Sequence, residues 1–485
     1  MRDKIARLLC SNRTLGQTVA KNTFWLGVSQ LASRLLRAIV VIYAARWLGA
    51  NGYGVFSYAL AIAGFLSLFS DIGVNWILVR ESARHPDSRS KYIATTFFAK
   101  TALLSVALLL LLFAAPFLVK IEGAKLLLPV VALLFFSDGL REFGFALIRS
   151  LEQMETEAGI NVFTNAATVT ISLVALWHYR TPYSLALAYT IASLLGTLLT
   201  AGLLRSHLSG LVNNFQRQLV APMLRAIWPF AAMNLLWSIF MYTDVLMLGW
   251  LSTATKVGLY SAAQRPVQLL LVLPMTVAAS LLPALSRFAH QADSRFKSLI
   301  ERGLALVMLM ALPLAGGGVV IAHQLITLLY GAEYGPSIQI FRVLSLSFLI
   351  TFPILVINNA VFAREWQARF LPNMLAGALS NVVLNWILIP HWGGLGAAAA
   401  TVVSQLLAYG TIYYGMQRRV GFTMLPVIYR MIIATILMMV VIELAGRWGI
   451  NFYLLMAAGI ITYTVTLLAL REPLIAKLKS IWSGV

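Results

Sequence analysis

The stretch Thr23–Gly49 is apolar and long enough to cross a membrane, yet it carries two arginines in its middle. About 20 apolar residues in a helix span roughly 30 Å of hydrocarbon. Arg34 and Arg37 are three positions apart, so they share one face of that helix. A charge at this depth costs roughly 3 kcal/mol or more. Each arginine is therefore expected to face water, a partner charge or an anionic ligand.

Apolar runs of this kind recur along the whole chain of 485 residues, of which 60% are hydrophobic and only 11% are charged. A soluble domain has about 25% charged residues. Membrane-crossing segments must be helices or strands of a closed barrel, and barrel strands alternate apolar and polar residues over about 10 positions. The runs here are continuous and roughly 20 residues or longer, the length of a membrane-spanning helix. The sequence therefore predicts an all-α, multi-pass membrane protein.

The apolar runs predict about fourteen membrane-spanning helices joined by short connections. The expected spans are 22–47, 52–79, 92–119, 125–150, 158–178, 183–205, 223–251, 257–287, 298–323, 337–363, 367–390, 394–416, 424–446 and 449–470. No connection is long enough to fold as a separate globular domain.

Lysine and arginine concentrate at both ends of the chain and in every second loop. Cytoplasmic loops carry such an excess, so both termini are predicted to be cytoplasmic. These loops account for the net charge of +20, and no nucleic-acid partner is predicted. The single cysteine, Cys10, excludes an internal disulfide and a cysteine-based metal site.

A short motif occurs twice, about two hundred residues apart. Trp47-Leu48 is followed by Tyr53-Gly54-Val55-Phe56-Ser57, and Trp250-Leu251 is followed by Val257-Gly258-Leu259-Tyr260-Ser261. Both copies join the first helix of a six-helix block to the second, so spans 1–6 and 7–12 are predicted to repeat one unit, an arrangement found in transporters. A chance match of common membrane residues is the alternative. The predicted organisation is a cytoplasmic segment 1–21, an N-lobe 22–205, a cytoplasmic linker 206–222, a C-lobe 223–416, and spans 13–14 with a cytoplasmic tail in 417–485.

Several stretches in a fixed order carry a family resemblance over nearly the whole chain. They are Arg46–Ala59, Asp71-Ile72-Gly73 leading to Arg80-Glu81, Tyr330–Tyr334, and Ile389–Ala398 followed by Thr401. Together they resemble the polysaccharide-transporter branch of the multidrug/oligosaccharidyl-lipid/polysaccharide exporter superfamily. The resemblance implies a V-shaped pair of six-helix bundles. It also implies translocation of a polyprenyl-diphosphate-linked oligosaccharide, such as an O-antigen repeat unit, across the bacterial inner membrane.

Ionisable side chains inside the predicted spans are the candidate functional site. Those in the first lobe share the cytoplasmic half of the membrane, and those in the second lobe lie in the outer half. The predicted substrate-binding residues are Arg34, Arg37, Lys100, Arg141, Arg265 and Arg342, and the ion-coupling candidates are Asp71, Asp138, Glu142 and Asp244. Arginine suits a diphosphate because its planar guanidinium bonds two phosphate oxygens at once.

Internal ion pairs that hold helices together are the alternative reading of these charges. Arg34 with Asp71, Lys100 with Glu142, and Asp244 with Arg265 are the pairs considered. This structural role is favoured for the carboxylates, whereas ligand contact is favoured for Arg34 and Arg37. Polar amides of the second lobe are expected to cross-link helices; they are Asn234, Gln264, Asn358, Asn359, Asn373, Asn381 and Asn385.

The sequence carries no Walker lysine motif, no zinc-type histidine pair and no Gly-x-Ser-x-Gly elbow. No catalytic residue, metal or cofactor is therefore predicted. The predicted function is a flippase for lipid-linked oligosaccharide, with that substrate, membrane lipids, a polysaccharide polymerase and chain-length proteins as partners.

Two other functions remain open at this point. A membrane glycosyltransferase or polymerase usually has a large external loop, and the outer loops here are short. A multidrug or cation extruder of the same fold would favour intramembrane carboxylates, whereas the charges within these spans are net basic.

Overall fold

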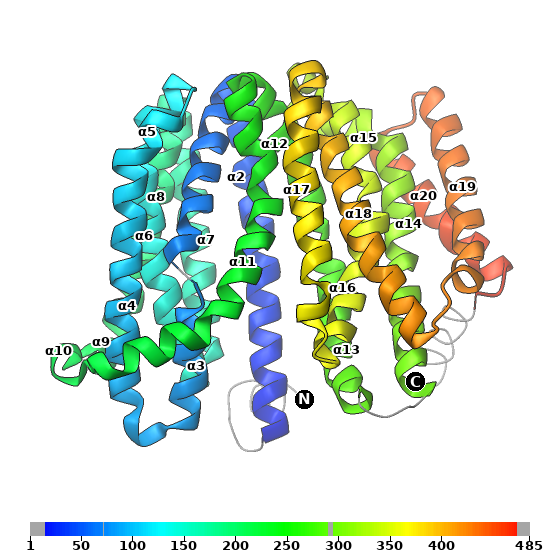
Figure 1. Cartoon of the computed structure of the whole chain (residues 1–485). Helices are drawn as coiled ribbons and strands as arrows, with labels where there is room; N and C mark the ends of the chain where they lie inside the picture. The colour runs from blue at the N-terminus through cyan, green and yellow to red at the C-terminus, as the bar shows by residue number, and fades with distance from the viewer. Residues whose placement is uncertain (1–14, 71, 290–293, 473–485) are drawn as a thin grey trace, which may run out of the picture. The chain divides into compact units, whose positions relative to one another are not determined.

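The computed structural model describes residues 15–70, 72–289 and 294–472, which form helices joined by short turns (Figure 1). Contacts divide the chain into a first unit that ends at Gly258 and a second unit that begins at Leu259. The first unit holds α2 (Leu15–Leu66), η1 (Ser67–Ser70), α3 (Val74–Arg84), η2 (Pro86–Ser88), α4 (Arg89–Leu109), η3 (Leu110–Ala114), α5 (Ala115–Leu118), α6 (Glu122–Ser150), α7 (Met154–Tyr179), α8 (Pro182–Leu203), α9 (Arg205–Leu208), α10 (Leu211–Asn214), α11 (Arg217–Leu251) and the start of α12 (Ala254–Leu270). The second holds the rest of α12, α13 (Val272–Phe288), α14 (Ser294–Tyr330), η4 (Ala332–Tyr334), α15 (Ser337–Leu346), α16 (Phe348–Ala363), α17 (Gln367–Trp392), α18 (Gly394–Val420), α19 (Leu425–Arg447) and α20 (Phe452–Ala469).

Within the described ranges, 12 segments are long and apolar enough to cross a membrane, against about fourteen predicted spans. The first segment, Gly27–Ser70, has 44 residues and contains Gly49, whose φ of 66° and ψ of 176° interrupt the helix. A positive φ is readily adopted only by glycine, so two helices meet at this residue. A shorter apolar stretch, Ser238–Leu251, lies in α11. The difference between the two counts lies at these two places, and the protein is an all-α, multi-pass membrane protein.

Helix α11 packs against α2, α3 and α4, so it belongs to the first unit. The sequence placed the corresponding span, 223–251, at the start of the second lobe. The boundary between contact units therefore lies in α12, later in the chain than the predicted linker 206–222. The division into two six-helix lobes, 22–205 and 223–416, stays a prediction.

The two copies of the repeated motif contact each other. Gly54 in α2 and Gly258 in α12 occupy matching positions in the repeat, and each lies against the backbone of the other copy. A Cβ on Gly54 would collide with the Ala254 carbonyl, and a Cβ on Gly258 would collide with the Ala50 carbonyl. Each copy has two small residues four positions apart, Ala50 and Gly54 in one and Ala254 and Gly258 in the other. Small residues at this spacing let two membrane helices approach closely. The contact is reciprocal, since each glycine lies against the backbone of the other copy of the motif.

The second predicted span, 52–79, is not one helix. Helix α2 ends at Leu66, the 3₁₀ turn η1 follows, and α3 begins after Gly73, whose φ is 114°. Ser67 Oγ donates to the Gly64 carbonyl at 2.7 Å, and Ser70 Oγ donates to the Ser67 carbonyl at 2.5 Å. Serine hydroxyls compensate backbone carbonyls in this way where a helix is interrupted. The prediction of one continuous helix was wrong here, because the pattern of apolar residues does not show these local hydrogen bonds.

Candidate functional site

A charged network joins α6 to α8 in the first unit. Asp138 and Arg141 lie one turn apart on α6 and form an ion pair, with Arg141 Nη2 2.7 Å from Asp138 Oδ1. Ser193 on α8 donates its Oγ hydrogen to the same Asp138 oxygen at 2.5 Å. Arg141 Nη1 donates to Ser193 Oγ at 3.3 Å, and Ser137 Oγ lies 2.7 Å from the same Ser193 Oγ. The network fixes the rotamers of Asp138 and Arg141 by contacts from two helices.

Arg37 on α2 faces this network and interacts electrostatically with Asp138, Arg141, Arg34 and Tyr189. Its side chain is exposed in the protein, whereas Arg34 is half-buried. Among the described residues, no carboxylate lies within ion-pair distance of the Arg37 guanidinium. Three arginines, Arg34, Arg37 and Arg141, thus lie near one another around Asp138. Such a group is suited to bind an anion with more than one charge.

Glu142 follows Arg141 on α6 and has an exposed side chain. Its charged neighbours are Arg149, Arg141, Asp138 and Glu157. It therefore lies between the Asp138 network and a second ion pair further along α6. The two pairs form a line of charged residues on the side of α6 that meets α7 and α8.

The second ion pair is bidentate and joins α6 to α7. Arg149 Nε lies 2.8 Å from Glu157 Oε2, and Arg149 Nη2 lies 2.5 Å from Glu157 Oε1. The Glu157 side chain is only 4% exposed, against 37% for Arg149. The sequence did not predict this pair, because the two residues lie on different helices and only the turn between α6 and α7 brings them together.

We expect Arg149→Met to lower the free energy of unfolding by about 3 kcal/mol, because Glu157 keeps a buried charge without its partner. Arg149→Met combined with Glu157→Leu should recover most of that loss. Thermal unfolding of the purified protein in detergent measures both. Lys125→Met is the control, since Lys125 and Glu122 form a solvent-exposed pair that contributes about 0–1 kcal/mol. A double variant no more stable than Arg149→Met would contradict this account.

Of the other predicted site residues, Asp71 lies outside the described residues. Lys100 on α4 and Asp244 on α11 are each 1% exposed. In the second unit, Arg265 Nη1 donates to Gln268 Oε1 at 3.2 Å, and Arg342 Nε donates to the Val319 carbonyl at 3.1 Å. The structure thus brings Arg34, Arg37, Asp138, Arg141 and Glu142 together.

The expectation that amides cross-link helices of the second unit is confirmed at three of them. Asn381 Nδ2 on α17 donates to Ser404 Oγ on α18 at 3.3 Å. Asn373 on α17 bonds Thr411 on α18 at 2.9 Å, and Asn359 on α16 bonds the Ala278 carbonyl on α13 at 2.5 Å. The side chain of Asn234 lies outside the described residues.

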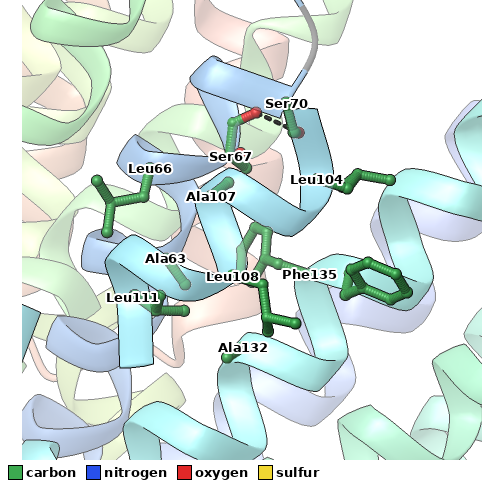
Figure 2. Close-up of a pocket in the computed structure, with 11 residues that line it drawn as sticks. Ala63, Leu66, Ser67, Ser70, Leu104, Ala107, Leu108, Leu111, Ala132 and Phe135 are labelled. Carbon is green, nitrogen blue, oxygen red and sulfur yellow. Dashed lines mark hydrogen bonds between the residues drawn. The ribbon is translucent and has the colours of Figure 1, made fainter. Parts of the chain in front are cut away.

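A small cavity of about 20 Å³ lies beside the break in α2, between α2, α4 and α6 (Figure 2). Ser67 and Ser70 supply its polar groups, and Leu104, Ala107 and Leu111 supply part of its apolar wall. A hollow of this size holds about one water molecule.

Sequence reasoning missed Ser137, Tyr189 and Ser193, although Ser193 holds both Asp138 and Arg141. Serine and tyrosine are ordinary residues of membrane helices, so their spacing gave no signal. Among the described residues, no group of three or more His, Cys, Asp or Glu side chains could hold a metal ion.

The many membrane-spanning helices, with a charged network that joins α2, α6 and α8, define a multi-pass membrane protein with ionisable groups inside its spans. The chain belongs to a family described as "Polysaccharide biosynthesis protein", whose model matches residues 19–289, more than half of its length. This match and the relatives below confirm the family resemblance drawn from the sequence motifs.

Two curated relatives cover most of the chain. A "Probable flippase AglR" from Haloferax volcanii is 25% identical over 76% of this chain and 77% of its own. A "Putative O-antigen transporter" from Shigella flexneri is 24% identical over 80% of this chain and 96% of its own.

Solved structures show the same fold at low sequence identity. A structure of the lipid II flippase MurJ in an inward closed conformation superposes with a TM-score of 0.77, covers 92% of this chain and 99% of its own, and is 15% identical. An inward-facing multidrug resistance transporter of the MATE family, within the MOP superfamily, gives a TM-score of 0.62 over 86% of this chain and 97% of its own at 14% identity. The predicted fold class is confirmed.

Proposed function

We propose that this chain is a flippase that moves a polyprenyl-diphosphate-linked oligosaccharide across the inner membrane by alternating access. The observation that carries the proposal is the group of three arginines, Arg37 beside Arg34 and Arg141, with Arg141 held by Asp138. Membership of the polysaccharide biosynthesis family and similarity to proteins named as flippase and O-antigen transporter support the same substrate class.

Each member of the charged group has a distinct part in the proposal. Asp138 and Ser193 hold Arg141 through two hydrogen bonds, so its guanidinium keeps one orientation. Arg37 and Arg34 supply two further guanidinium groups from α2 beside Arg141. A diphosphate that leaves water loses hydration, and several guanidiniums offset that cost with bidentate hydrogen bonds. The polyprenyl chain stays in the bilayer, where its transfer needs no polar contact.

Coupling to an ion gradient is assigned to the carboxylates closest to the arginines. Asp138 and Glu142 are in electrostatic contact with Arg141, so a cation or proton that binds them changes the net charge offered to the substrate. Asp71 and Asp244 remain further candidates. Lys100, Arg265 and Arg342 remain candidate substrate contacts elsewhere on the head group's route. Both termini are proposed to be cytoplasmic, with a polysaccharide polymerase and chain-length proteins as partners.

Deletion of the gene in its own cell is expected to trap lipid-linked oligosaccharide on the cytoplasmic side and to stop its appearance outside. The reason is that a charged diphosphate head group does not cross hydrocarbon unaided. Labelled glycan on the surface and lipid-linked intermediate in extracted membranes are measured together, with the restored gene as control. Normal surface glycan in the deletion strain would contradict the proposal. Normal glycan with a new sensitivity to cationic drugs would instead identify an extruder.

A further inference from the structure

The first unit contains an apolar cavity of about 570 Å³ that is separate from the charged network. Its volume falls in the range of roughly 300–1,000 Å³ that is usual for small-ligand sites. The second half of α2, the segment 110–119 and the end of α11 form its walls. The residues that matter here are Tyr58, Phe65, Leu110, Ala114 and Trp250.

One wall of the cavity is built from an unusual helix segment. The chain forms a π-helix at Leu110–Ala114, directly before α5. Pro116 lacks a backbone N–H, so the carbonyl four residues before it, that of Leu112, loses its α-helical partner. The wider π turn directs Leu110 and Ala114 toward the cavity. Such π segments occur often at functional sites.

The rim of the cavity carries a cation. Lys120 Nζ lies 4.4 Å from the centre of the Trp250 ring, and Trp250 lines the cavity. The lysine follows α5, which Figure 1 shows at the upper end of the first unit. Phe117 on α5 is 90% exposed, so this surface is in contact with lipid chains when the protein is in a membrane. An apolar hollow, a tryptophan and a lysine thus follow one another over a short distance.

We propose that this cavity is a binding site for an anionic phospholipid, with one acyl chain in the cavity and the phosphate at Lys120. The order of groups matches the order in a phospholipid, in which the charged head group follows the apolar chain. A lysine near the membrane surface favours anionic lipids. Trp250 belongs to the interfacial region, where its ring contacts both chain and head group. The site is independent of the proposed transport substrate, since it shares no residue with the Arg37 group.

The test uses the purified full-length protein, delipidated in detergent, with phosphatidylglycerol or phosphatidylcholine added. A lipid that binds the folded state raises the midpoint of thermal unfolding. Phosphatidylglycerol should raise it at a lower concentration than phosphatidylcholine. Lys120→Gln should weaken phosphatidylglycerol binding about fivefold and abolish the preference between the two lipids. Lys125→Gln is the matched control, because Lys125 lies nearby but is paired with Glu122, and it should keep the preference.

A second pair of measurements tests the chain site directly. Ala114→Phe places a large side chain in the cavity and should reduce the response to both lipids. Phosphatidylglycerol with brominated acyl chains should quench part of the tryptophan fluorescence, and Trp250→Phe should remove that part. The proposal is overturned if Lys120→Gln keeps the lipid preference, or if Trp250→Phe leaves the quenching unchanged. A stronger response to polyprenyl phosphate than to phosphatidylglycerol would also overturn it.

Discussion

Replacement of Arg37 by alanine is expected to lower export of the lipid-linked glycan by about 10- to 150-fold while the folded protein keeps its stability. No carboxylate of the described residues forms an ion pair with the Arg37 guanidinium, so its removal leaves no carboxylate without its partner. A phosphate contact of this kind is worth roughly 1.5–3 kcal/mol, and a bidentate one more. Surface glycan in a deletion strain and the midpoint of thermal unfolding measure the two quantities.

Two further variants make the interpretation of Arg37→Ala specific. Arg37→Lys keeps the charge but loses the planar fork, so export should return only in part. Arg149→Met is the opposite case, because that arginine pairs with the buried Glu157 and its loss should reduce stability. Full export by well-expressed Arg37→Ala protein would remove this residue from the mechanism. A large fall in its unfolding midpoint would show a structural role instead.

Replacement of Gly54 by leucine is expected to separate the two copies of the repeat and to lower export at least tenfold. A side chain here meets the Ala254 carbonyl and the Gly258 backbone nitrogen, which cannot move aside as a side chain would. Overpacking usually costs about 1–3 kcal/mol, and a backbone collision lies at the upper end or beyond. The unfolding midpoint and surface glycan are measured on the same preparation.

Gly202 supplies the matched control for Gly54. It also lies in a membrane-spanning helix, α8, but no atom beyond the backbone of its own helix and its chain neighbours lies within 4 Å of the position of an added Cβ. Gly202→Leu should therefore leave the unfolding midpoint and export close to those of the natural protein. If Gly54→Leu and Gly202→Leu have the same unfolding midpoint and the same export, the close contact between Gly54 and Gly258 is not needed for either.

Particular residues show how far the sequence leads toward the site. Arg34 and Arg37 were evident from the sequence as charges in an apolar run. In the structure, α2 places them beside α6, where they join the predicted cluster of charges. Asp138 and Arg141 were evident for the same reason, although their mutual ion pair was not foreseen. The roles of Ser193 and Glu157 were not foreseen. Each lies on a helix other than α6, and only the packing of that helix against α6 brings it to its partner.

The break at residues 67–73 shows the same division for the fold. The apolar run 52–79 has the length of one span, and the serines within it are common in membrane helices. Only the folded chain shows Ser67 and Ser70 bonded to nearby carbonyls, with Gly73 at positive φ. Local hydrogen bonds of this kind compete with the helix on nearly equal terms, so neighbouring helices decide between them.

By itself, the sequence determined an all-helical membrane protein with a repeated motif and positive charge within its spans. It could do so because every backbone polar group must be hydrogen-bonded within the protein in hydrocarbon, which permits few structures. The length of each apolar run also shows whether a helix of that length can span the membrane. The tertiary structure alone decided which charges meet, where a span breaks, and that Gly54 and Gly258 lie in backbone contact. Those outcomes depend on contacts between residues far apart in the chain, and helical periodicity does not encode such contacts.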